Sequence, residues 1–139
     1  MLANGTPDQV QALKLYGQHF GLAYQLVDDW LDYAGDAASM GKNVGDDLAE
    51  GKLTLPLIHA LQHSSDAGSR IIRQAIEAQA AETLPDVLKV VRDSGALDYT
   101  RAAAQSQSER AIEHLHVLPD SPFREALSDL SRFCVSRLS

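Results

Sequence analysis

The feature that most constrains the fold is a long helical stretch that begins near the amino terminus. Thr6 can cap this helix, Pro7 suits its first position, and Gln9 can reach back to the cap. The apolar residues that follow lie on more than one side of the helix, so other helices should enclose it. They are Val10, Leu13, Leu15, Phe20, Ala23, Tyr24, Leu26, Val27, Trp30 and Leu31. The sequence therefore predicts a central helix, and the helical pattern of apolar residues ends after Tyr33.

The rest of the chain also has helical spacing. A glycine-containing stretch over 35–45 indicates a loop, and helical spacing resumes near Asp47. Further helices are expected after Pro56, over 71–80, from 83–86 onward and over 97–115, with a last one starting at Ser121 and Pro122. We find no alternating strand pattern, repeat or low-complexity tract. The sequence therefore predicts an all-α helical bundle, with residues 1–139 forming one domain.

Composition narrows the possible functions. Twelve basic and nineteen acidic residues give a net charge of −7, which disfavours binding to nucleic acid. No apolar run approaches the roughly 18 residues of a membrane span. The first ten residues lack a signal-peptide pattern, and the single cysteine, Cys134, has no partner for an internal disulfide. We therefore expect a cytoplasmic protein without a membrane span.

An acidic cluster interrupts the apolar end of the first helix. Asp28 and Asp32 are four residues apart and share one face, while Asp29 lies about 100° around the helix. Like charges repel at this spacing, and apolar neighbours imply a high desolvation cost. A solvated acidic face would explain the cluster more simply, but only Gln25 supplies a polar neighbour one turn earlier. Magnesium binds one or two carboxylates together with water and substrate phosphates, so the cluster predicts a Mg²⁺ site.

A loop with two lysines follows the acidic helix. Lys42 and Lys52 stand among the glycines of the stretch 41–52. Glycines let the backbone approach a ligand, and lysines supply point charges for phosphate. Ordinary solvated lysines are the alternative interpretation. Because this loop comes directly after the carboxylates, the sequence favours one common site that binds both the metal and a diphosphate.

These residues occur in a recognisable order. Asp28-Asp29-Trp30-Leu31-Asp32 is followed by the stretches GKNVGDDL, over 41–48, and EGKLTLPL, over 50–57. The arrangement resembles the second signature region of the trans-isoprenyl (polyprenyl) diphosphate synthases. The later stretches 95–97 and 117–120 are similar to the bacterial, octaprenyl-forming branch of that family, so the resemblance extends through nearly the whole chain.

The resemblance implies the carboxyl-terminal part of the isoprenoid synthase fold. It also implies a homodimer that elongates an allylic diphosphate with isopentenyl diphosphate units, in isoprenoid biosynthesis leading to quinone side chains. By the same resemblance, Asp28, Asp29 and Asp32 hold Mg²⁺, while the allylic diphosphate is contacted by Gln25, Lys42 and Lys52. The family's earlier aspartate-rich motif does not occur in this sequence, so we expect a prenyltransferase fragment that carries half of the site and is inactive alone.

Two other interpretations stay open at this point. The chain could be a catalytically inactive helical module whose exposed apolar surface drives self-association. A terpene cyclase also uses aspartate-rich helices, but the lysine-glycine stretch belongs with the elongating enzymes.

His59 and His63 are four residues apart and could chelate a metal, yet no third metal ligand follows, so we expect surface histidines.

Overall fold

In the computed structural model, residues 5–34, 48, 50–78 and 83–138 are described. The described part of the chain contains six α-helices and one short 3₁₀ helix with defined bounds, and it contains no strand. They are α1 (Pro7–Ala34), α4 (Leu55–His63), α5 (Asp66–Ala78), α6 (Leu84–Asp93), α7 (Ala96–His114), η2 (Leu115–Val117) and α8 (Pro122–Ser136). The all-α prediction is confirmed. The expected loop over 35–45 and the helix start near Asp47 lie outside the described residues.

The helix boundaries follow the capping signals. The Thr6 backbone N–H donates to Gln9 Oε1 at 3.0 Å, and the Gln9 N–H donates to Thr6 Oγ1 at 3.1 Å, so the predicted capping box forms. Ser121 Oγ accepts from the Arg124 N–H at 3.2 Å and caps α8. Gly95 has a φ of 80°, which glycine adopts without strain, and it separates α6 from α7.

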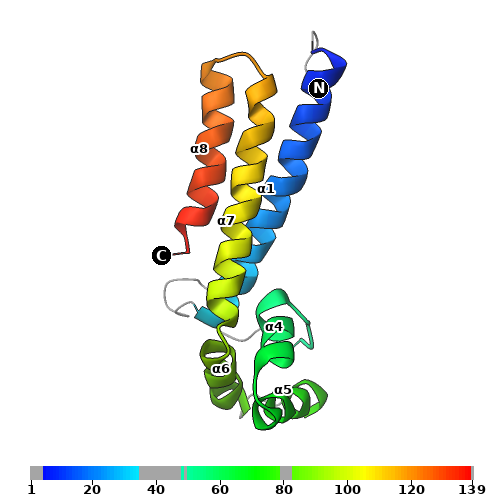
Figure 1. Cartoon of the computed structure of the whole chain (residues 1–139), viewed down its shortest axis with the longest axis vertical. Coiled ribbons are helices and arrows are strands. Elements are labelled where there is room, and N and C mark those ends of the chain that lie inside the picture. Colours follow the sequence, from blue (N-terminus) through cyan, green and yellow to red (C-terminus); the bar gives the residue numbers. More distant parts are fainter. Residues whose placement is uncertain (1–4, 35–47, 49, 79–82, 139) are drawn as a thin grey trace. The chain divides into compact units, whose positions relative to one another are not determined.

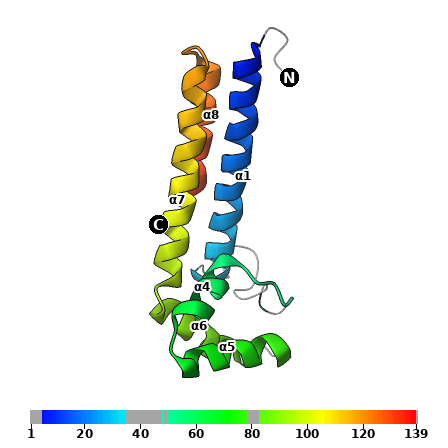
Figure 2. The same ribbon diagram turned by 45° about the vertical axis from the view of Figure 1, so that its right-hand side comes forward.

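The chain divides into two compact units, one formed by residues 1–27 with 102–139 and the other by 28–101. Within the first unit, α1, α7 and α8 lie alongside one another (Figures 1 and 2). Its core is formed by Tyr16, Ala111, Leu115 and Leu118, with Leu13, Phe20 and Leu127 packed against them. α1 packs on this face as predicted, but the prediction of a largely enclosed helix was too broad. Val10 and Tyr24, which it included, are 40% and 52% exposed.

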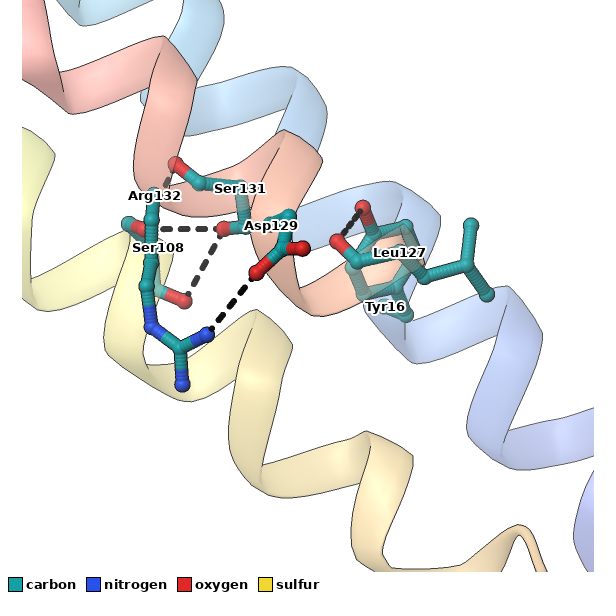
Figure 3. Close-up of polar contacts among 6 residues, drawn as sticks. All are labelled: Tyr16, Ser108, Leu127, Asp129, Ser131 and Arg132. Carbon is teal, nitrogen blue, oxygen red and sulfur yellow. Dashed lines mark hydrogen bonds and ion pairs between the residues drawn. The ribbon is translucent and has the colours of Figure 1, made fainter. Parts of the chain in front are cut away.

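Two polar contacts fix α8 within the first unit (Figure 3). The Tyr16 hydroxyl of α1 donates to the Leu127 carbonyl oxygen at 2.8 Å. Ser108 of α7 and Ser131 of α8 are buried, and their hydroxyl oxygens lie 2.8 Å apart. Each serine also donates to the other's carbonyl oxygen, at 3.0 and 3.2 Å. Such small, mutually bonded side chains let the two helices approach closely without leaving buried hydroxyls unpaired.

The second unit has its own apolar core, in which α4, α5 and α6 pack against one another. The buried residues are Tyr33, Leu48, Leu57, Ala60, Ile72, Ala75, Val87, Val91 and Ala96. Gly68 permits the close approach of these helices, since a Cβ there would lie 3.1 Å from both Ser64 Cβ and Val90 Cγ1. None of the described helices is long and apolar enough to cross a bilayer.

Three rings stack in this unit, which the sequence did not predict. The His59 ring lies 4.1 Å from that of His63 and 4.4 Å from that of Tyr99, between ring centroids. His63 Nδ1 is 3.1 Å from the His59 carbonyl oxygen. His63 is exposed as expected, whereas His59 is only half-exposed, so its description as a surface histidine was incomplete. Burial, and secondarily the charge of His63, lower the pKa of His59.

We expect the chain to lose stability in mild acid because of His59. Its pKa is lower in the folded than in the unfolded chain, so the unfolded chain binds more protons as the pH falls below about 6.5. The stability present above that pH is then lost progressively. Urea unfolding at several pH values between 8 and 5 measures this.

His59→Phe retains an aromatic ring in the stack but has no titrating group. It should therefore make the free energy of unfolding depend less on pH. His63→Gln removes the secondary cause and should reduce that dependence partly. A His59→Phe profile that matches the wild-type profile would contradict the assignment.

Candidate functional site

The candidate site lies on the carboxyl-terminal turns of α1. Asp28 is partly buried, Asp29 is 7% exposed and Asp32 is fully buried. All three are inside the helix, so the spacing that puts Asp28 and Asp32 on one face is realised. The expected partial burial of the aspartates is confirmed for this part of α1.

Burial makes the aspartates electrostatically demanding. An ionised carboxylate removed from water costs several kcal/mol unless positive charge or hydrogen bonds compensate it. Asp29 and Asp32 both interact with other groups of the protein. A divalent cation would supply further compensation where the carboxylates meet solvent, and Asp28 is the most accessible of the three.

The donor set fits a hard cation that also binds substrate. Among the described residues, no three His, Cys, Asp or Glu side chains converge as a ready-made metal cage. Magnesium typically takes only one or two carboxylates, with water and phosphate oxygens completing its shell. The aspartates present fit such a shared site better than a permanent structural metal.

An arginine that the sequence did not single out holds this end of α1. The Arg101 guanidinium lies 5.3 Å from the ring centroid of Trp30, at cation–π distance. Trp30 is about 200° around the helix from Asp28, so the contact is made on the side of α1 that faces away from it. Arg101 is 71 residues further along the chain. No local pattern could have revealed this pairing.

Of the three residues predicted to contact the diphosphate, the structure describes Gln25 and Lys52. Gln25 is exposed on α1. Lys52 Nζ lies 3.0 Å from Glu50 Oε2, and both side chains are 59% exposed. An exposed pair of this kind contributes little to stability. Lys42 lies outside the described residues.

Comparison with known proteins identifies the family of proteins in which these residues occur. The chain is 46% identical to octaprenyl diphosphate synthase of Escherichia coli K12 over 138 residues, 99% of this chain and 43% of that protein. It is 43% identical to the all-trans-nonaprenyl-diphosphate synthase of Rhodobacter capsulatus over 134 residues, 96% of this chain and 41% of that protein. The chain thus spans less than half the length of the curated relatives it matches.

Solved structures confirm the fold. The polyprenyl synthase of Caulobacter crescentus, crystallised with calcium and isoprenyl diphosphate, superposes with a TM-score of 0.89 at 37% identity, covering 99% of this chain and 42% of that one. The geranylgeranyl pyrophosphate synthase of Corynebacterium glutamicum, crystallised with isoprenyl diphosphate and magnesium, gives a TM-score of 0.87 at 31% identity, covering 97% and 39%. The predicted isoprenoid synthase architecture and the resemblance to octaprenyl-forming enzymes are both confirmed. These matches do not favour the alternative of a catalytically inactive helical self-association module. Because residues 1–93 also match the polyprenyl synthetase family itself, the chain belongs to that family.

Proposed function

We propose that this chain supplies the second aspartate-rich, magnesium- and diphosphate-binding part of a trans-polyprenyl diphosphate synthase. The observation that carries the proposal is the burial of Asp29 and Asp32 beside the more accessible Asp28 on one helix. Bound molecules in the related crystal structures include isoprenyl diphosphate with calcium or magnesium. The divalent cations named for those relatives are of the kind that carboxylate oxygens take, with phosphate oxygens completing the metal's shell.

Each predicted residue has a defined task in this proposal. Asp28, Asp29 and Asp32 hold Mg²⁺, and Lys42, Lys52 and Gln25 contact the diphosphate. When bound, the metal neutralises charge that develops on the departing diphosphate. The carboxylates fix where the diphosphate sits, and the lysines add positive charge around its oxygens.

The complete synthase would extend an allylic diphosphate by isopentenyl diphosphate units, in the pathway to quinone side chains. We propose that residues 1–139 form part of one synthase domain and that the active enzyme is a cytoplasmic homodimer. Since elongation also needs the family's earlier aspartate-rich motif and a site for isopentenyl diphosphate, we expect binding but no turnover by this chain alone.

The direct test measures binding of farnesyl diphosphate by calorimetry, with magnesium and with EDTA. We expect magnesium-dependent binding that weakens about tenfold or more in Asp28→Ala, the loss of roughly 1.4 kcal/mol. Asp86→Ala is the matched control, because Asp86 is an exposed aspartate in the first turn of another helix. Equal affinity of Asp28→Ala and the wild type, or binding that ignores magnesium, would contradict the proposal.

The single tryptophan, Trp30, gives a test of the Arg101 contact that holds this end of α1. Arg101→Ala should expose the Trp30 ring, shift its fluorescence emission to longer wavelength and cost about 1 kcal/mol of unfolding free energy. Arg101→Lys retains the cation, so its emission wavelength and its free energy of unfolding should lie between those of Arg101→Ala and the wild type. An unchanged emission spectrum in Arg101→Ala would show that the arginine does not cover this ring.

A further inference from the structure

Two histidines from different helices meet within the first unit. His19 lies on α1 and His114 is the last residue of α7, and these helices run alongside one another (Figures 1 and 2). The two ring centroids are 5.2 Å apart, and the ring planes differ by 10°. Both side chains are half-buried. Neither histidine takes part in the proposed function.

A hydrogen bond sets the tautomer of His19. Its Nδ1 lies 2.6 Å from Oε1 of Gln107 on α7, an amide oxygen that can only accept. In the neutral ring the proton is therefore on Nδ1 and the lone pair is on Nε2. Histidines that bind metals characteristically donate their other ring N–H to an oxygen in this way. Gln107 thus holds His19 in the form that can bind a metal through Nε2.

The remaining ring nitrogens are open. Within the part of the chain that the structure describes, neither His19 Nε2 nor either ring nitrogen of His114 makes a hydrogen bond. None of these nitrogens is buried away from water. A metal ion could therefore reach both rings without breaking a hydrogen bond.

The separation of the rings suits one shared ion. Zn²⁺ binds histidine nitrogens at about 2.0–2.1 Å with tetrahedral angles, which places the centroids of two imidazoles on one ion about 5 Å apart. The observed distance is 5.2 Å. The near-parallel planes must turn relative to each other so that both lone pairs point at the ion. Rotation about χ2 of His114 supplies this turn, because that torsion has broad minima and no hydrogen bond restrains the ring.

We propose that His19 and His114 bind one divalent transition-metal ion, of the Zn²⁺, Cu²⁺ or Ni²⁺ type, with Gln107 orienting His19. Imidazole nitrogen suits these ions, whereas Mg²⁺ takes the oxygens of carboxylates and phosphates. Among the described residues no third His, Cys, Asp or Glu joins the pair, so water completes the shell and the ion can exchange. The bound ion links α1 to α7 and stabilises their packing, because it favours the folded arrangement.

Calorimetric titration of the whole chain with Zn²⁺ tests the site. The His63→Gln background removes the second histidine pair, His59 and His63 on α4, and excess Mg²⁺ competes for the carboxylates. We expect one Zn²⁺ per chain, with an affinity that falls tenfold or more in His19→Ala and in His114→Ala. His116→Ala is the matched control, because His116 is an exposed histidine two residues from His114. Equal Zn²⁺ affinity of His114→Ala and His116→Ala would overturn the proposal.

Two further variants keep the test decisive if an alanine substitution unfolds the chain. His114→Cys exchanges one Zn²⁺ ligand for another and should retain binding. Gln107→Ala retains both histidines but releases the His19 ring, so the affinity should fall about tenfold. Circular dichroism shows whether each variant is folded. Binding that is lost in folded His114→Cys, or undiminished in Gln107→Ala, would count against the site.

Thermal unfolding measures the link between the two helices independently. In the same background, excess Zn²⁺ should raise the midpoint of unfolding by several degrees, and EDTA should reverse the rise. The rise should vanish in His19→Ala. It should persist in Asp28→Ala, which removes a carboxylate of the proposed magnesium site and neither histidine. A midpoint that does not respond to Zn²⁺, or a rise that persists in His19→Ala, would contradict an ion shared by α1 and α7.

Discussion

The burial of carboxylates in the last turns of α1 is the constraint on which the candidate site depends. Asp29 and Asp32 lie in a helix whose other residues at this end are largely apolar. Retaining these charges costs free energy that hydrophobic residues of similar size would not cost. Such an arrangement persists where the charges perform a task, and binding a divalent cation with a diphosphate is the task that oxygen donors at this spacing perform well.

The surroundings of the aspartates keep this end of α1 in one orientation. Trp30 packs against Arg101, and Tyr33 is fully buried in the apolar core of the second unit. Both side chains lie on other sides of the helix from Asp28, so their contacts turn that carboxylate toward solvent. Orientation by neighbouring packing gives a metal ligand its accuracy, because loosely held ligands bind metal weakly.

Much of the fold could be predicted because its signals are local. The Thr6–Gln9 capping box, Pro56 in the first turn of α4 and Gly95 between helices each depend on a few adjacent residues. The placement of the three aspartates within one helix was predicted in the same way from their spacing, while their role as metal ligands stays a prediction. The Trp30–Arg101 contact and the ring stack at His59 could not be found, because each joins residues far apart in sequence through tertiary packing. The exposure of Phe123, Leu130 and Phe133 on α8 could not be predicted either, because periodicity does not tell which apolar side chains a neighbour covers.

Paramagnetic NMR tests the central claim most directly. Manganese can replace magnesium at oxygen-donor sites and broadens the resonances of nearby nuclei. With inorganic diphosphate present, substoichiometric Mn²⁺ should broaden the backbone amide signals of Asp28, Asp29 and Asp32 first. It should leave those near Val10 sharp, because Val10 lies about 27 Å along α1 from Asp28 at 1.5 Å per residue. Broadening that begins elsewhere, or that spreads evenly over the acidic surface, would contradict a metal and diphosphate site on α1.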